Sequence, residues 1–586
     1  MIFATLLPLC LAYPLALGEW QRPEGGGDAP LHAFAPAGTF AWIETTAHAP
    51  LVAQGLEHPW MKKVLDSPLV KAEFSKRGVD PYAAIEAAKA ALGASPFDIL
   101  SGLTSDGIAI GLVPGFGKEP RPFAIMRGSD ADAFEDALDP LVDALSGFDA
   151  IRKIAIEKGK ALGDHVEGAW NIGGGAAFAA AFDDQTIIIT TNLADLTSCA
   201  KRATKAEGLA ASRAGFKSMG DTFAWLDLDT IEKGGELRDL RAMTTNAGAH
   251  FALGPVLTHF GSASTLGFDI DFNGDAITSR MRAEGTRAGK GAASFPGQGR
   301  KAPRCPKPAA SEVGRIHLYR DIETLLDLRT DLFEAQALPG IAEGIAGVAL
   351  ILGGPDATEE VIDAIDPHWL VLFDDVEFDP AAAPDVPIPS ATGVFHLANP
   401  EVNGMRLVQA FQSLISLQNV QRAMQGRSGF LLSLRPVNSH TMTVASLPAP
   451  GGDGGVDVGY NLAPACAAVG DHFVIGTHHA SVASAVERIS SGQLERTPDD
   501  TLDQASISSK ALANLVASNR DILQMNAMLK EGKAKSQATM EIDVLLALLG
   551  GIESFDFETA DPGALGGTDG QGSAPLEARL TVRLAR

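Results

Sequence analysis

The feature that most constrains the fold is an internal repeat that runs through most of the chain. Gly38-Thr39-Phe40-Ala41-Trp42-Ile43-Glu44 is echoed by Asp221-Thr222-Phe223-Ala224-Trp225-Leu226-Asp227, and each stretch opens a series of helical segments followed by two strands. Gly314 to Tyr319 and Ala505 to Ser508 open two further series with weaker identity. The pattern predicts a β-αα-ββ unit that occurs four times.

A different segment is inserted between the first two units, and a counterpart lies between the last two. We expect each insert to contain a helix, a hairpin and a second helix. Ser129 is predicted to cap the first helix, and Asn399 and Pro400 to start its counterpart. The apolar face of the first helix is given by Phe134, Ala137, Leu138, Leu141, Val142 and Leu145.

Several further segments match between the two inserts and between the two chain ends. Phe182 to Ile189 matches Val469 to Gly476, which places Asp184 opposite Asp471. Trp170-Asn171-Ile172 matches Tyr460-Asn461-Leu462, and Phe268-Asp269-Ile270-Asp271 matches Phe555-Asp556-Phe557-Glu558. A nearly constant offset predicts two homologous α+β halves, residues 38–285 and 312–586.

Each half is expected to be an antiparallel sheet with helices packed on one face and the other face wet. This follows from the closing strand, in which apolar and polar residues alternate. The residues expected to face inward are Leu576, Ala578, Leu580, Val582 and Leu584, and those expected to face outward are Glu577, Arg579, Thr581 and Arg583.

Residues 286–311 read as a linker rich in Gly, Ala and Pro. A local basic run lies in it, in an otherwise acidic protein: Arg287, Lys290, Arg300, Lys301, Arg304 and Lys307. The run is open to interpretation as a docking or processing segment. We favour a solvated tether that lies along the acidic domains.

The N-terminus predicts export. Met1 to Leu17 is almost wholly apolar but too short to span a bilayer, and Ala16-Leu17-Gly18 offers small residues to a signal peptidase. We predict a signal peptide at 1–18, a flexible segment at 19–37, and a periplasmic, cell-surface or extracellular location. Because no Lys or Arg precedes the apolar run, an uncleaved anchor, which would be the only contact with a membrane, and a buried N-terminal segment stay as alternatives. A lipobox at Cys10 is rejected because Leu9 is not small.

Charge and cysteine content exclude several classes of protein. The net charge of −25 disfavours nucleic acid and anionic lipid as partners. After cleavage Cys199, Cys305 and Cys466 remain, which allow at most one bridge and exclude a disulfide scaffold. The apolar stretch from Leu338 to Gly354 is interrupted by Glu343 and several glycines, so we interpret it as a core helix.

The sharpest candidate for a metal site is Asp269-Ile270-Asp271-Phe272-Asn273-Gly274, which fits the first half of an EF-hand loop. The twelfth position of that loop needs a bidentate Glu and holds Arg280. Asn273-Gly274 is instead a favoured hairpin turn. In that register Ile270 faces Ile277 on the buried side, and Arg280 lies diagonal to Asp269 on the wet face.

The remaining motifs also favour structural interpretations. Asp374, Asp375, Glu377 and Asp379 follow a strand whose alternation separates their carboxylates, and His478-His479 lacks further ligands at zinc spacing. Gly115-Phe116-Gly117 and Gly173-Gly174-Gly175 fail the phosphate-loop patterns, and no nucleophile motif is present. We therefore predict no catalytic, cofactor-binding or metal-binding residues, and no cofactor.

The opening strand, the β-αα-ββ unit and the inserted hairpin resemble a broad group of bacterial exported proteins of unknown function with a duplicated architecture. The resemblance covers most of the chain from Thr39 onward and implies an extracytoplasmic setting. It implies no activity, so no functional residue is carried over.

Three hypotheses for function follow. The first is a non-enzymatic envelope or extracellular protein that binds another protein or self-assembles. The second is a carrier of a hydrophobic, lipid-like ligand between sheet and helices, suggested by the apolar helices Leu338 to Leu352 and Ile542 to Leu549. The third is a hydrolase whose active site is assembled from distant residues.

Overall fold

The computed structural model describes the chain over the following residues: 31–36, 38–45, 86, 89–90, 92–115, 120–147, 151–153, 166–173, 177–182, 184–203, 222–233, 260–261, 263–273, 276–285, 303–327, 329–332, 338–378, 383–448, 458–496, 501–560 and 576–584. The predicted signal peptide and most of the segments at 19–37 and 286–311 lie outside these residues. So do Asp379, Gly274, and parts of both glycine motifs.

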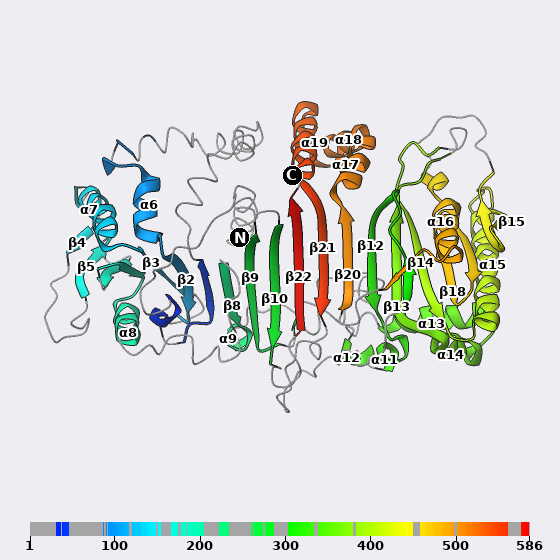
Figure 1. Ribbon diagram of the computed structural model, residues 1–586, viewed down its shortest axis with the longest axis horizontal. Helices are drawn as coiled ribbons and strands as arrows, with labels where there is room; N and C mark the ends of the chain where they lie inside the picture. The colour runs from blue at the N-terminus through cyan, green and yellow to red at the C-terminus, as the bar shows by residue number, and fades with distance from the viewer. Residues whose placement is uncertain are drawn as a thin grey trace. The chain divides into compact units, whose positions relative to one another are not determined.

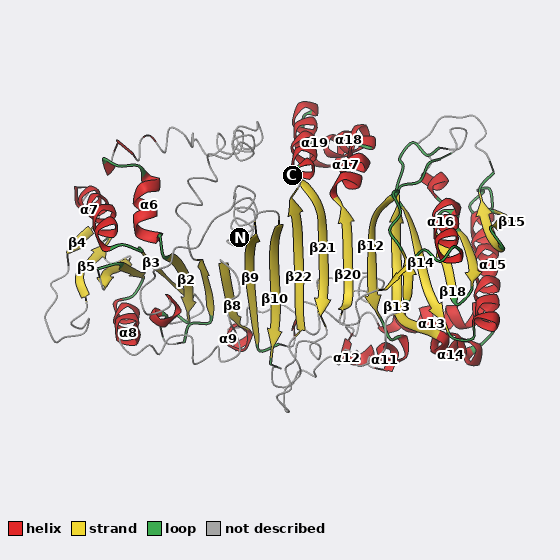
Figure 2. Cartoon of the chain, in the orientation of Figure 1, coloured by secondary structure: helices red, strands yellow, loops and turns green. Residues whose placement is uncertain are grey.

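The chain divides into two compact units. Unit 1 comprises Met1–Leu237 and Ser264–Ala283, and unit 2 comprises Arg238–Ala263 and Glu284–Arg586. Both are α+β with antiparallel sheets, which confirms the predicted fold class (Figures 1 and 2).

Unit 1 contains strands and helices at these positions: η2 Leu31–Phe34, β1 Ala41–Thr45, α6 Pro96–Thr104, β2 Gly107–Val113, β3 Arg121–Arg127, α7 Ala131–Gly147, β4 Ile151–Lys153, β5 Val166–Ile172, β6 Ala177–Phe182, β7 Thr186–Thr190, α8 Leu193–Ala203, β8 Thr222–Asp227, α9 Leu228–Lys233, β9 Thr265–Asn273 and β10 Ala276–Glu284. Its strands pair in the order β10-β9-β8-β1-β2-β3-β7-β6-β5-β4.

Unit 2 contains the remaining elements: β11 Arg304–Pro306, β12 Glu312–Tyr319, α11 Ile322–Asp327, α12 Arg329–Leu332, α13 Leu338–Leu352, α14 Pro355–Ala364, β13 Ile365–Asp374, β14 Ser390–Leu397, α15 Pro400–Met424, β15 Leu431–Val437, β16 His440–Ser446, η5 Val458–Asn461, β17 Ala465–Val469, β18 His472–Gly476, α16 His479–Ser490, β19 Leu494–Arg496, β20 Thr501–Ser508, α17 Ser509–Ser518, α18 Arg520–Glu531, α19 Lys535–Gly550, β21 Ile552–Ala560 and β22 Leu576–Leu584. Its main sheet pairs in the order β22-β21-β20-β12-β13-β14-β18-β17-β16-β15.

The strands of the two units, taken in chain order and leaving β11 and β19 aside, pair in the same sequence. Within each unit the two opening strands of the repeated series lie next to each other. Trp42 of β1 pairs with Trp225 of β8, and Gly314 of β12 pairs with Ile507 of β20. The hydroxyls of Thr45 and Thr222 lie 2.7 Å apart across the first of these pairs.

Helices cover both faces of each sheet in the inserted segments, which differs from the predicted single helical face. In unit 2 the side chains of Ala465 and Ala467 pack in the cluster of α16, whereas Cys466 packs with Phe411 and Ile415 of α15. Strands with an unbroken apolar run have no wet face, so both faces need cover. The prediction of one covered and one wet face therefore fails for the strands of the inserted segments.

Two sequence matches, and the predicted facing of the closing strand, differ from the structure. Asp184 and Gly470, rather than Asp184 and Asp471, occupy equivalent turn positions with φ of 53° and 59°. Trp170 lies in β5, whereas Tyr460 lies in the 3₁₀ helix η5. In the closing strand Leu580 is 38% exposed and Glu577 is buried, where Glu577 forms an ion pair with Arg579.

The predicted helix starts hold to within two residues, but their capping differs. Asp130, not Ser129, accepts a hydrogen bond from the backbone N–H of Ala133 at 2.9 Å. α15 begins at Pro400 as predicted, but the side chain of Asn399 makes no capping hydrogen bond and its φ is 51°.

The last part of the predicted linker belongs to unit 2. Arg304–Pro306 forms β11, which pairs with β19 in a small second sheet. The carbonyl oxygen of Lys307 accepts a hydrogen bond from Arg488 at 2.6 Å. In its described part the segment is therefore packed and hydrogen-bonded, not a solvated tether.

Candidate binding surface

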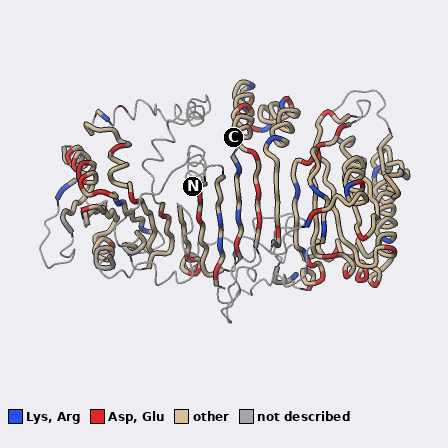
Figure 3. Tube along the Cα trace, viewed as in Figure 1, with Lys and Arg blue, Asp and Glu red and all other residues tan. Residues whose placement is uncertain are grey.

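The inserted segment of unit 2 has an unusual charge distribution in this acidic chain. No Asp or Glu occurs between Glu401 and Asp453, a stretch that holds Arg406, Arg422, Arg427 and Arg435. It forms α15, β15 and β16, along which Figure 3 shows basic but no acidic positions past the start of α15. This depletion is visible in the sequence, but none of the motifs considered above points to it.

α15 is apolar on two opposite faces. Its inner face buries Phe411 and Ile415 against β14, β17 and β18. On the outer face Leu417, Val420 and Met424, spaced three and four residues apart, are exposed. Packing in the core requires apolar side chains on only one face of such a helix. The core therefore does not explain the apolar side chains on the outer face of α15.

The end of α15 is fixed against the chain that leads into β15. Asn419 donates a hydrogen bond to the carbonyl oxygen of Phe430 at 2.9 Å and accepts one from its backbone N–H at 2.6 Å. The guanidinium of Arg422 lies 5.0 Å from the centre of the Phe430 ring. The C-terminal end of α15 and the start of β15 are therefore held against each other.

β15 is an edge strand with exposed apolar side chains. Among the described strands it pairs only with β16, and Leu431, Leu432 and Leu434 are exposed at 61%, 45% and 69%. Edge strands of soluble proteins usually carry charges or are covered, because a free apolar edge invites pairing with another chain. β15 has one charge, Arg435, and one proline, Pro436.

α13 packs beside α15 and is not the predicted core helix. None of its side chains is buried, and Leu350 is 83% exposed. Apart from Glu343 the helix carries no charge, so its exposed surface is largely apolar. Among the described residues no single helix has the length and apolar character of a membrane span, while α13 and α14 together do, with a bend of 96° between them.

We define the α15–β15 surface by its exposed apolar side chains and its arginines: Val402, Met405, Leu414, Leu417, Val420, Met424, Leu431, Leu432, Leu434, Arg406, Arg422, Arg427 and Arg435. The charge of Arg435 also reaches the start of α16. Burial lowers the pKa of His479 below its ordinary value, and the positive charge of Arg435 lowers this pKa further. The surface is thus apolar and positively charged.

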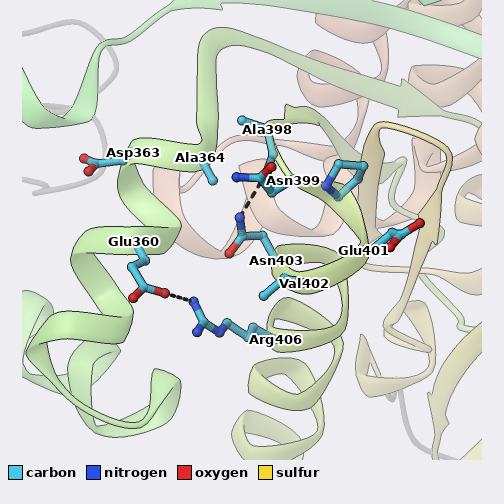
Figure 4. A pocket seen from close by; sticks show the side chains of 10 residues that line it. Glu360, Asp363, Ala364, Ala398, Asn399, Glu401, Val402, Asn403 and Arg406 are labelled. Carbon is cyan, nitrogen blue, oxygen red and sulfur yellow. Dashed lines mark hydrogen bonds and ion pairs between the residues drawn. The ribbon is translucent and has the colours of Figure 1, made fainter.

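A cleft lies between α14 and the start of α15 (Figure 4). It has a volume of about 630 Å³ and is lined by Glu360, Asp363, Ala364, Ala398, Asn399, Pro400, Glu401, Val402, Asn403 and Arg406. Arg406 forms an ion pair with Glu360, and Asn403 donates a hydrogen bond to the carbonyl oxygen of Ala398 at 3.0 Å. Among the described residues that line it there is no Ser, Thr, Cys, His, Tyr or Lys, so they offer no base or nucleophile other than carboxylates.

A cluster of histidines that the sequence did not reveal lies on one face of the central strands of unit 2. His317, His368, His396 and His472 come from β12, β13, β14 and β18, and Cys305 of β11 lies 3.8 Å from Nε2 of His317. Burial lowers the pKa of His317 to about 4, with Arg315 and His368 acting in the same direction. The cavity between them is about 20 Å³, and the described residues hold no group of ligands suited to a metal ion.

Each motif considered for metal binding has a structural role where it is described. Arg280 donates a hydrogen bond to Asp269 at 3.0 Å, which is the contact predicted there, although Asn273 lies in β9 and not in the turn. Asp374 is buried beside Ser311, and burial raises its pKa. His478 caps α16 by accepting a hydrogen bond from the backbone N–H of Ala480.

The three described cysteines, Cys199, Cys305 and Cys466, are buried thiols that form no disulfide with one another. Burial raises the pKa of Cys466 to about 12, so this thiol stays protonated and unreactive at neutral pH.

Comparison of the chain with protein-family models, with characterised proteins and with solved structures finds no match.

Proposed function

We propose that the protein is a non-enzymatic, exported binding or assembly component that contacts another macromolecule through the α15–β15 surface. The observation that carries the proposal is the outer face of α15, where Leu417, Val420 and Met424 are exposed opposite a buried face that already anchors the helix. Covering one such side chain stabilises a complex by about 1.5–3 kcal/mol.

The arrangement favours a protein partner or a further copy of the chain. An exposed apolar patch rimmed by charge is typical of protein–protein contact sites, and arginine is enriched in them. The arginines would be attracted to an acidic partner, which suits a surface set in a strongly acidic chain.

The described cavities support neither alternative hypothesis. The apolar helix α13, which suggested a lipid carrier, buries none of its side chains. The described lining of the cleft beside α14 has no Ser, Cys, His or Lys, and of its carboxylates Glu360 already pairs with Arg406. Binding at a surface is the function best supported.

Site-specific photo-crosslinking in the organism of origin tests the proposal. A photoreactive phenylalanine derivative replaces Val420 in one variant and Leu529 of α18 in the other, both exposed and apolar. We expect a discrete crosslinked species of defined mass at position 420 and none at position 529. No species at 420, or the same species at both positions, contradicts a dedicated contact surface.

A further inference from the structure

No described strand pairs with the outer edge of β15, and this edge presents backbone groups in a defined pattern. β15 and β16 are joined by the two-residue turn Asn438-Ser439, and Val437 pairs with His440. In such a hairpin the pair beside the turn is hydrogen-bonded, and every second pair after it is too. The N–H groups of Leu432 and Leu434 therefore point away from β16. Residue 436 is the next position whose backbone faces away from β16. It is a proline, which has no N–H group.

The two faces of β15 differ in chemistry. Leu432 and Leu434 pair with Ala445 and Thr443 and so lie on the face of α15, because Ala445 packs with Phe411. Ser433 and Arg435 pair with Val444 and Met442 and lie on the face of α16. A strand added at this edge would meet Leu432 and Leu434 on one face, and Leu431, Ser433 and Arg435 on the other.

We propose that the α15–β15 surface binds its partner by β-strand addition, in which an extended segment with alternating acidic and apolar residues pairs with the free edge of β15. The proposal rests on the proposed binding function and specifies its mode. Backbone hydrogen bonds to Leu432 and Leu434 hold the segment, its apolar residues pack beside these leucines, and an acidic residue meets Arg435.

Two other occupants fit the surface less well. A lipid surface covers apolar and basic side chains, but hydrocarbon cannot satisfy the outward N–H and C=O groups of an open sheet edge. Pairing of β15 with β15 of a second copy brings together two surfaces that are both positively charged and free of acids. An extended acidic segment can form hydrogen bonds with the outward N–H and C=O groups of β15 and can also pair with the positive charge of the arginines.

Hydrogen exchange at residue resolution, on the full chain, tests the inference with a blocked eight-residue peptide that alternates Glu and Val. In the free protein we expect the amides of Leu432 and Leu434 to exchange quickly and those of Ser433 and Arg435 to be protected by β16. With saturating peptide we expect exchange at Leu432 and Leu434 to slow at least about tenfold. A peptide that alternates Lys and Val serves as the matched control and is expected to have no effect.

Leu434→Pro and Leu434→Ala separate backbone pairing from side-chain contact. Proline at 434 removes an N–H that β16 does not use, so the hairpin is retained, which protection at Ser433 checks in the same experiment. We expect the peptide to bind Leu434→Ala more weakly and Leu434→Pro not at all.

Unchanged exchange at Leu432 and Leu434, or equal slowing by the Lys–Val peptide, overturns strand addition. Equal binding to Leu434→Pro does the same. The crosslink at position 420 is independent of these outcomes, because it reports contact with α15 by any partner. A crosslink without protection of β15 rejects strand addition and leaves the proposed function standing, and loss of both rejects both.

Discussion

At the scale of single residues, the ion pairs of unit 2 differ sharply in their surroundings. Arg320 and Asp503 are almost fully buried, with side-chain exposures of 1% and 6%, and meet through two hydrogen bonds of 2.7 and 2.9 Å. Arg583 and Asp556 form the same kind of pair at the surface, where the exposures are 59% and 28%. Breaking a buried pair leaves a charge without compensation, whereas water replaces a lost partner at the surface.

Arg320→Met is therefore expected to lower the free energy of unfolding of unit 2 by about 3–5 kcal/mol. Arg583→Met is the matched control and is expected to lower it by less than about 1 kcal/mol. Urea denaturation followed by circular dichroism measures both. Similar losses in the two variants would show that burial does not set the contribution of the Arg320–Asp503 pair.

The histidine cluster predicts a pH dependence of stability. The pKa of His317 is about 4 in the folded chain against 6.5 ordinarily, so between these values the unfolded chain binds more protons. Above pH 6.5 His317 does not lower the free energy of unfolding, because it is neutral in both states. As the pH falls from 6.5 toward 4, this residue alone lowers the free energy of unfolding by about 3 kcal/mol.

His317→Gln is expected to reduce that loss when unfolding is measured from pH 8 to pH 4. At pH 8 the imidazole is neutral in both states, so the value there gives the baseline effect of the substitution in each protein. An identical pH dependence in wild type and variant would contradict a depressed pKa for His317.

Sequence reasoning at this scale succeeded where partners are close along the chain. Arg280 contacts Asp269 as predicted, because β9 and β10 are consecutive in the chain and pair with each other. It missed the histidine cluster because β14 and β18 are brought together by long connections, and their register depends on packing of the whole sheet.

At the scale of elements, two helices with apolar runs have different environments. α13 was expected in the core and has no buried side chain, whereas α19 buries Ala538, Ile542 and Leu549. An apolar composition indicates that a helix tends to be buried, but it does not identify the element or partner that packs on it. The recurring strands were predictable because alternation and turn residues are local, but the second helical face of each sheet was not.

Leu350→Ala in α13 is expected to change the free energy of unfolding by less than about 0.5 kcal/mol, because the side chain is 83% exposed. Leu549→Ala in α19 removes the same atoms from a buried position and is expected to cost about 2–5 kcal/mol. Thermal and urea unfolding compare the two. A cost of several kcal/mol for Leu350→Ala would place α13 in a core.

At the scale of the whole molecule, each unit has an antiparallel sheet whose strands pair in the same sequence. The regular recurrence of opening strands and terminal hairpins made this α+β organisation accessible from the sequence. The α15–β15 surface was not predicted, because it depends on which face of α15 the sheet leaves uncovered. Only the charge depletion between Glu401 and Asp453 signals it in the sequence.

Native mass spectrometry of the gently purified protein tests most directly whether the α15–β15 surface holds a macromolecular partner, as proposed. We predict a mass above that of one chain by a protein-sized step. Val420→Glu with Met424→Glu is expected to abolish the step, and Leu523→Glu with Leu529→Glu in α18, which are also exposed, to keep it. A wild-type protein that shows one chain only, or a step that survives Val420→Glu with Met424→Glu, would contradict the claim.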